Sequence, residues 1–99
     1  MTIAVAADHA GFRYKERIKQ SLEAAGFGVL DLGTYDERPV DYPDFGYAAG
    51  LAVSSGQVER AIVVCGSSIG ISIAANKVPG VRCAPVADVA VTELSRRHN

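Results

Sequence analysis

Short apolar runs, each about the length of a β-strand, alternate along this chain with stretches in which apolar residues recur every three or four positions. The runs expected to form strands are residues 3–7, 29–32, 61–64 and 81–84. Parallel strands must be joined by long crossover connections, and these are usually helices. The alternation therefore predicts an α/β fold with a central parallel sheet.

The first helix is predicted from its amphipathic pattern. Tyr14, Ile18, Leu22 and Ala25 recur at helical spacing, whereas Lys15, Glu16, Arg17, Lys19 and Glu23 occupy the other face. This pattern directs Tyr14 toward the core and Lys15 toward solvent. Gly26 is expected to end the helix.

Three further helices are predicted between and after the other runs. A helix of small residues follows Asp41–Asp44 and ends at Gly56, and another continues to Lys77 before Pro79 and Gly80 break it. The last helix is expected to begin near Asp88 as N-cap and to direct Val91 and Leu94 inward.

Residues 61–64 give the clearest strand prediction because the run is continuous, β-branched and apolar. Such a run is typical of a central strand that is covered on both faces. The strand is expected to end at Cys65. Cys83, within the run 81–84, is expected to be a small core residue.

The composition is that of a single globular domain, residues 1–99. Apolar residues make up 48% of the sequence and charged residues 21%, which is close to the average for folded domains. A formal net charge of -1 disfavours a nucleic-acid partner. No basic start precedes the first apolar run, and no stretch approaches a membrane span, so the cytoplasm is the expected compartment. Two cysteines without a C-x-x-C spacing make a disulfide framework an unfavoured interpretation.

Two loops are placed to carry chemistry, since open α/β sheets bind ligands beyond the carboxyl ends of their strands. Asp8-His9-Ala10-Gly11 follows the first strand, and Cys65-Gly66-Ser67-Ser68-Ile69-Gly70 follows the third. A glycine-rich turn that opens a helix presents backbone N–H groups to an anion. The positive electrostatic potential of these N–H groups and of the helix dipole favours the thiolate of Cys65, which suits this side chain to accept a proton.

Structural interpretations of these residues stay open at this point. Cys65 can be a buried cysteine before a tight turn, and Asp8 can cap the following helix. Tyr42, between Asp41 and Asp44, can belong to a proline-anchored helix entry, and His98 can be a solvated cation at a helix end. A nucleotide-binding P-loop is disfavoured because the loop lacks Gly-Lys-Ser/Thr. A cysteine phosphatase is disfavoured because Ile71 occupies the position of the phosphate-binding arginine.

Six short motifs, in this order, resemble those of the ribose-5-phosphate isomerase B family, which also includes subunits of galactose-6-phosphate isomerase. They are Asp8-His9-Ala10-Gly11, Asp31-Leu32-Gly33-Thr34, Asp41-Tyr42-Pro43-Asp44, Cys65-Gly66-Ser67-Ser68-Ile69-Gly70, Ala74-Ala75-Asn76-Lys77 and Arg96-Arg97-His98-Asn99. The resemblance extends over the whole chain. It implies a Rossmann-like, three-layer α/β/α fold and isomerisation of ribose 5-phosphate to ribulose 5-phosphate in pentose phosphate metabolism.

The resemblance also implies a role for each catalytic candidate. Cys65 would move a proton between C1 and C2 of the open-chain sugar. Ser67, with the backbone N–H groups from Gly66 to Gly70, would hold the enediolate oxygen. His98 would transfer a proton during opening of the furanose ring, and Asp8 would assist it.

The remaining implied residues bind the substrate. His9 would contact the phosphate, Tyr42 and Asn99 would bind sugar hydroxyls, and Ser68, Ile69 and Gly70 would line the anion cradle. The resemblance implies no metal and no cofactor. It implies a homodimer, or a dimer of dimers, in which a partner subunit completes each site.

The chain departs from the family pattern in two respects. Ser68 stands where the family usually has glycine, which is strained if the backbone there needs a positive φ. The family also continues past His98-Asn99 with another strand, a final helix and phosphate-binding arginines, so truncation before these elements is expected. The alternatives that stay open are a non-catalytic fragment that binds a sugar phosphate or another anion, a fragment that only folds, and an isomerase of allose or galactose 6-phosphate.

Overall fold

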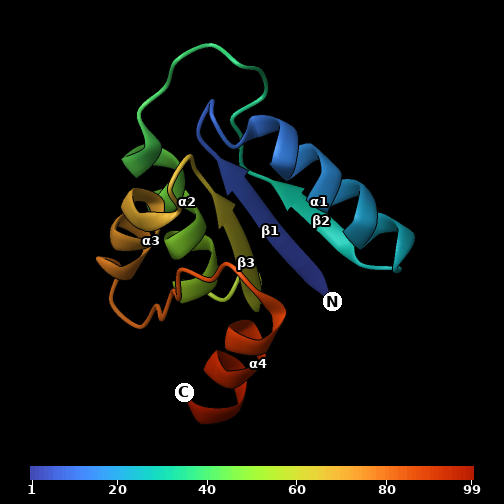
Figure 1. Cartoon of the computed structure of the whole chain (residues 1–99), viewed down its shortest axis with the longest axis vertical. Coiled ribbons are helices and arrows are strands. Elements are labelled where there is room, and N and C mark those ends of the chain that lie inside the picture. The colour runs from blue at the N-terminus through green and yellow to red at the C-terminus, as the bar shows by residue number, and fades with distance from the viewer.

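The computed structural model describes residues 1–99, and its centre is a sheet of three parallel strands. The strands are β1 (Thr2–Ala7), β2 (Gly28–Asp31) and β3 (Arg60–Val64), and their order is β2-β1-β3 (Figure 1). The central position belongs to β1, whose residues from Ile3 to Ala7 are all buried. The expectation that residues 61–64 form a central strand is therefore wrong: β3 is an edge strand and only half-buried.

Helices cover both faces of this sheet. Helix α1 (Phe12–Ala24) lies on one face, and α2 (Tyr42–Ser54) and α3 (Ile69–Asn76) lie together on the other (Figure 1). Gly26 has a φ of +90° and follows the end of α1, as its C-terminal position requires. The predicted three-layer α/β/α architecture is confirmed.

Two glycines of α2 allow α3 to pack unusually close. A Cβ atom on Gly46 would lie 2.6 Å from the carbonyl oxygen of Ile71, and one on Gly50 would lie 2.7 Å from the Val78 side chain. Only a residue without a side chain fits at these two positions. The contact fixes α3, and with it the loop that precedes α3, against the body of the domain.

The inward face of α1 differs from the prediction at two positions. Tyr14 is 64% exposed, whereas the Lys15 side chain is 0% exposed. Lys15 Nζ lies 2.7 Å from both carboxylate oxygens of Asp31 on β2 and 2.9 Å from Glu16 Oε2. A buried charge is tolerated when it is paired in this way, and the amphipathic pattern of one helix does not reveal a partner on a distant strand.

Asp31 organises the contacts around Lys15. Its carboxylate also accepts hydrogen bonds from the Gly33 N–H, at 3.0 Å, and from Lys19 Nζ, at 3.2 Å. Burial works against ionisation of Asp31, but these bonds and the bond from Lys15 outweigh it and hold the pKa of the carboxyl below its usual value. The end of β2 is thereby fastened to α1.

Residues 81–84 do not form the fourth strand that their pattern predicts. The backbone N–H and carbonyl of Cys83 are instead bonded to the side-chain amide of Asn76, at 2.8 and 2.7 Å. A cavity of about 380 Å³ lies between this segment and β3, lined by Ala61 to Val63 on one side and by Val81 and Cys83 on the other. The segment forms no ladder with β3, because the cavity separates the two and Asn76 binds the backbone N–H and carbonyl of Cys83.

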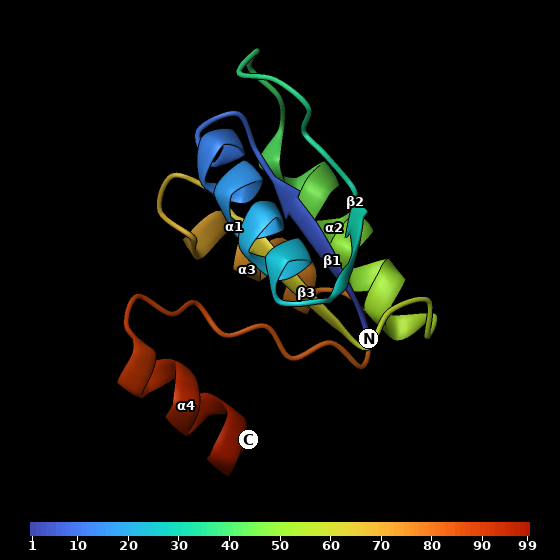
Figure 2. The same ribbon diagram turned by 90° about the vertical axis from the view of Figure 1, so that its right-hand side faces the viewer.

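The last helix, α4 (Val89–His98), lies apart from the layers of the domain (Figure 2). Its predicted start is confirmed, since the Asp88 carboxylate accepts a hydrogen bond of 2.8 Å from the Val91 N–H. The expectation that Val91 and Leu94 point inward is wrong, because both are about half exposed and no residue of α4 is buried. No helix of the structure is long and apolar enough to cross a membrane.

The contact between Asp31 and Lys15 makes a prediction about stability. Asp31→Asn leaves the buried ammonium of Lys15 with the exposed Glu16 as its only carboxylate partner, so the free energy of unfolding should fall by about 2–3 kcal/mol at pH 7. Because the pKa of Asp31 is lower in the folded than in the unfolded chain, its contribution is fully present above about pH 4. The difference between wild type and variant should shrink as the pH falls further, which urea unfolding at a series of pH values measures.

Asp36→Asn is the matched control for this experiment. Asp36 also forms an ion pair, with Arg38, but that pair is exposed to solvent. Exposed pairs contribute little to stability, so this variant should unfold as the wild type does. An equal loss in the two variants would contradict a special role for the buried pair.

Candidate functional site

The loops after β1 and β3 meet at the carboxyl end of the sheet. The Asp8 N–H donates to the carbonyl oxygen of Val64, at 3.2 Å, so the two strands stay paired to their ends. A Cβ atom on Gly11 would lie 2.6 Å from the same oxygen, which leaves room for glycine alone. The two chemistry-bearing loops of the sequence are thus held in contact.

Asp8 is buried and shapes its own loop. Its carboxylate accepts a hydrogen bond of 2.9 Å from the Gly11 N–H, immediately before α1. Asp8 therefore stabilises the turn before α1, but it is not the helix cap considered from the sequence, because Gly11 is the N-cap and has no side-chain cap bond. The backbone N–H of the same residue bonds to Val64, so Asp8 joins the turn before α1 to the end of β3.

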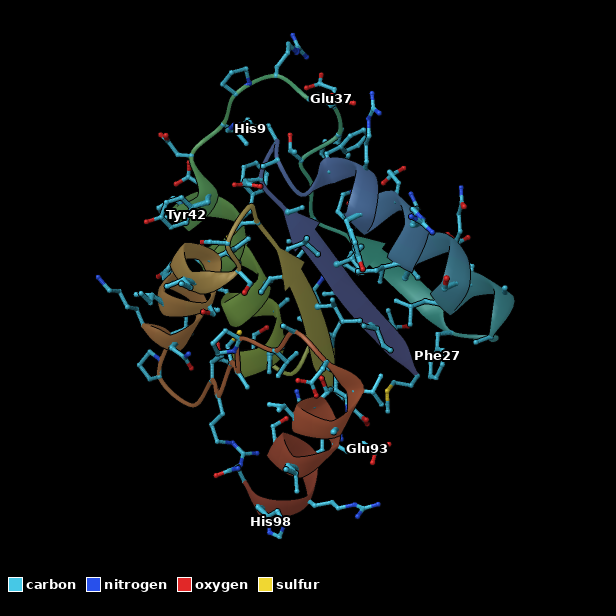
Figure 3. The ribbon with its side chains drawn as sticks, in the orientation of Figure 1. His9, Phe27, Glu37, Tyr42, Glu93 and His98 are labelled. Atoms are coloured by element: carbon cyan, nitrogen blue, oxygen red, sulfur yellow. The ribbon has the colours of Figure 1, made fainter.

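His9 is half-buried and is held by a residue that the sequence did not single out. Its Nδ1 atom accepts a hydrogen bond of 3.1 Å from the backbone N–H of Val40, in the loop between β2 and α2. A main-chain donor leaves no mark on the amino-acid sequence, so no signal could have identified Val40. His9 and Tyr42 lie at the same end of the molecule (Figure 3).

The Cys65 loop has the features of an anion cradle. Cys65 is half-buried, and its carbonyl oxygen accepts from the Ser68 N–H at 3.3 Å, which closes the turn before α3. Ser67 Oγ accepts from the Ile69 N–H at 3.3 Å. The N–H groups of Gly66 and Gly70 have no acceptor within the chain. They are free for an anion, and the positive end of the α3 dipole reinforces them.

Tyr42 packs directly on this cradle. A Cβ atom on Gly70 would lie 2.6 Å from Cε1 of the Tyr42 ring, so the ring occupies the space that any side chain at position 70 would need. Tyr42 begins α2, where Pro43 follows it. The structure therefore brings Tyr42 together with the loop that carries Cys65.

Ser68 adopts the backbone conformation in which a side chain is strained. Its φ is +63°, and it is the N-cap of α3. All other residues with positive φ in the chain are glycines. The backbone at this position does require positive φ, as considered from the sequence, so the serine costs conformational energy here.

His98 and Asn99 do not join the site within one chain. His98 lies at the opposite end of the molecule from His9 and Tyr42 (Figure 3). The carbonyl oxygen of Asn99 accepts a hydrogen bond from the Arg82 guanidinium, and the C-terminus lies away from the carboxyl ends of the strands (Figure 1). Of the residues named from the sequence, those of the two loops and Tyr42 are gathered together, and these two are not.

Cys83, the second free cysteine, sits in different surroundings. It is half-buried beside the cavity that borders β3. Burial raises the pKa of the Cys83 thiol, against the opposing influence of Arg96. This thiol is therefore held in its neutral form and lies outside the candidate site.

Sequence comparison relates almost the whole chain to one enzyme family. The sequence model described as Ribose/Galactose Isomerase matches residues 3–99. Ribose-5-phosphate isomerase B of Escherichia coli is 41% identical over 98% of this chain, which covers 65% of that protein. Subunit LacB of galactose-6-phosphate isomerase from Clostridium acetobutylicum is 39% identical over 99% of this chain, which covers 57% of that protein.

Solved structures share the fold closely. Ribose-5-phosphate isomerase B of Clostridium thermocellum superposes with a TM-score of 0.98 at 46% identity, over 99% of this chain and 66% of that one. The enzyme from Mycoplasma genitalium, solved with bound ribulose 5-phosphate, superposes with a TM-score of 0.91 at 36% identity, over 98% of this chain and 65% of that one. The chain thus spans about two thirds of the length of these relatives.

The strained backbone at Ser68 makes a prediction about stability. Ser68→Gly removes the Cβ atom that disfavours positive φ, so the free energy of unfolding should rise by about 0.5–1 kcal/mol. Ser68→Ala removes the hydroxyl but keeps the Cβ atom, and it should bring no gain. Urea unfolding of the two variants beside the wild type measures the difference, and a gain from alanine as large as that from glycine would contradict strain as the cause.

Proposed function

Because the chain belongs to the ribose/galactose isomerase family, we propose that it interconverts ribose 5-phosphate and ribulose 5-phosphate without a cofactor. The observation that carries this proposal is the contact between the two loops at the carboxyl end of the sheet, with Tyr42 against the Cys65 loop. A relative of this family has been solved with ribulose 5-phosphate bound. Membership of this family supports a sugar phosphate as the substrate.

The proposed chemistry is a proton transfer between neighbouring carbons. The Cys65 thiolate removes the proton from C2 of the open-chain aldose, and the electrons of that bond form a C1–C2 double bond as the carbonyl oxygen on C1 becomes an enediolate oxygen. The thiol then returns the proton to C1, and the proton of the C2 hydroxyl passes to the enediolate oxygen on C1. The oxygen on C2 thereby becomes the carbonyl oxygen and the oxygen on C1 becomes a hydroxyl. Atoms and charge are balanced without a redox partner.

The negative charge of the enediolate needs donors, and the Cys65 loop offers them. The free N–H groups of Gly66 and Gly70 stand at the positive end of α3, and the Ser67 hydroxyl lies in the same loop. Ser68 and Ile69 shape the cradle, since their N–H groups are bonded within the loop to the Cys65 carbonyl and to Ser67 Oγ. Preorganised main-chain donors of this kind can stabilise an oxyanion in the absence of a metal ion.

The other residues are proposed to bind and open the sugar. His9 contacts the phosphate, and Tyr42 and Asn99 bind sugar hydroxyls. His98 transfers the proton that opens the furanose ring, and Asp8 assists. Asp8 is well placed for an indirect part, since its carboxylate already fixes the Gly11 turn.

The distance between His98 and the Cys65 loop supports a site made by two chains. His98 lies at the far end of the molecule from His9 and Tyr42 (Figure 3), so one chain does not bring ring opening and proton transfer to a single sugar. We propose a homodimer, alone or within a dimer of dimers, in which α4 of one protomer carries His98 to the Cys65 loop of its partner. In a two-fold dimer this contact occurs twice.

A second function is supported by the free N–H groups of Gly66 and Gly70 at the start of α3. These groups suit a chain that binds a sugar phosphate or another anion at the α3 cradle without turning it over. Galactose 6-phosphate as a different substrate is supported by the identity of 39% to a galactose-6-phosphate isomerase subunit, and allose 6-phosphate stays an alternative from the sequence resemblance.

Turnover assays distinguish these functions. The purified 99-residue chain, with its intact mass verified, is assayed with ribose 5-phosphate, allose 6-phosphate and galactose 6-phosphate, and calorimetry measures the binding of each. Preferential turnover of ribose 5-phosphate is the expected result. Binding without turnover would replace the isomerase with the anion-binding function, and preference for a hexose phosphate would replace the substrate.

Cys65→Ala tests the proposed base. We expect turnover to fall by at least about a thousandfold, because the base is lost, while binding of the sugar phosphate changes little. Cys83→Ala is the matched control, since it removes the other half-buried free cysteine. It should retain most of the activity. If Cys65→Ala were as active as the control, another group would have to be the base.

Mixing two inactive variants tests the shared site. Chains with Cys65→Ala and chains with His98→Asn are each expected to be inactive, but a mixed dimer contains one site with both native residues. After exchange of subunits, the mixture should regain about a quarter of the wild-type activity. Sedimentation measures the dimer in the same samples. A mixture that stays inactive although mixed dimers form would show that Cys65 and His98 of different chains do not share a site.

A further inference from the structure

The contact between His9 and Val40 determines where the imidazole carries its proton. The bond from the Val40 N–H to His9 Nδ1 is 3.1 Å long. A backbone N–H can only donate, so Nδ1 must accept with its lone pair and carries no proton itself. In the neutral ring the single proton is then on Nε2.

The donor itself is held firmly at both ends of its loop. On the β2 side, the Thr34 N–H donates to the Ala7 carbonyl at 2.8 Å, and the Ala7 N–H donates to the Gly33 carbonyl at 2.7 Å. On the other side, α2 begins two residues after Val40. Pro39, immediately before Val40, limits the backbone further. The two ends of the loop that carries the Val40 N–H are thus anchored to β1 and α2.

The second nitrogen of His9 is free for a ligand. Nε2 has no hydrogen-bond partner within the chain, and the structure contains no buried side-chain nitrogen or oxygen that lacks a partner. Nε2 is therefore accessible from outside. His9 and Tyr42 share one end of the molecule, and Tyr42 packs on the anion cradle (Figure 3).

We propose that the Val40 N–H fixes His9 as the Nε2–H tautomer, so that His9 offers a hydrogen-bond donor, and not a lone pair, to a bound anion. Val40 is thus a positioning residue that acts through its backbone. The opposite tautomer would direct a lone pair at the anion, and two lone pairs repel each other. That the anion is a phosphate group rests on the proposed function, whereas the tautomer does not.

Nitrogen NMR of the two histidines tests the tautomer directly. The chain contains only His9 and His98, so the variants His9→Asn and His98→Asn assign both rings. At about pH 8.5, where an ordinary imidazole is neutral, His9 should be a single tautomer protonated on Nε2. His98 is exposed and should show the mixture of a free imidazole.

Val40→Pro removes the donor, and Val40→Ala is its matched control. Without the N–H, His9 should move toward the mixture seen for His98, whereas the alanine variant should keep the single tautomer. A His9 ring protonated on Nδ1, or one that is unchanged in Val40→Pro, would overturn the proposal.

Two substitutions of His9 test its two nitrogens one at a time. They show whether Nε2 donates to the anion even if Val40→Pro does not fold. Asn places its Oδ1 near the position of Nδ1, and Gln places its amide nitrogen near the position of Nε2. Inorganic phosphate is titrated while the amide signals of residue 9 and of Val40, its hydrogen-bond partner, are followed. His9→Gln should keep affinity within about threefold of wild type, and His9→Asn should lose about tenfold.

The outcomes separate this inference from the proposed function. Equal phosphate affinities in the two variants would overturn the donor role of Nε2. If the wild-type chain gave no response to phosphate, the anion half of the proposal would be wrong and the proposed function would be weakened with it. The NMR comparison of Val40→Pro with Val40→Ala would still show whether the Val40 N–H fixes the tautomer of His9.

Discussion

The close approach of Gly11 to the end of β3 is the constraint on which the site depends. With the Val64 carbonyl oxygen only 2.6 Å from where a Cβ atom would lie, the turn before α1 is pressed against the end of β3. The Asp8 N–H bonds to the same oxygen. The two loops at the carboxyl end of the sheet therefore form one surface, on which a small anion could touch both. A side chain at position 11 would push them apart.

The sequence pattern predicted the elements of the fold better than their places in it. Strands β1, β2 and β3 and the start of α4 at Asp88 follow from local residues, because periodicity and capping are local properties. The failure at residues 81–84 has a different origin. Their apolar pattern is typical of a strand, but the Asn76 amide takes the backbone groups of Cys83. A pattern that reports side-chain polarity does not show which backbone groups are already bonded.

Some features of the candidate site could likewise be predicted from the sequence, and others could not. The loop of Cys65 and the loop of Asp8 and His9 could be located from their positions after two strands of an α/β fold. The contact of Tyr42 with Gly70 and the bond from Val40 to His9 could not, because they depend on how a distant loop is folded back. His98 shows the limit most clearly. A shared motif names the residue, but the single chain leaves it at the other end of the molecule.

The ion pair between Lys15 on α1 and Asp31 on β2 constrains how this sequence can change during evolution. Lys15 is fully buried and its ammonium is bonded to both oxygens of Asp31. Loss of Asp31 leaves the Lys15 ammonium with only the exposed Glu16 as counter-charge, and loss of Lys15 leaves the Asp31 carboxylate with only Lys19. Loss of both together, with apolar residues in their place, need not be harmful. The route between two stable sequences thus passes through an unstable intermediate. The two positions, which are 16 residues apart in the chain, are expected to vary together among descendants of this protein, or not at all.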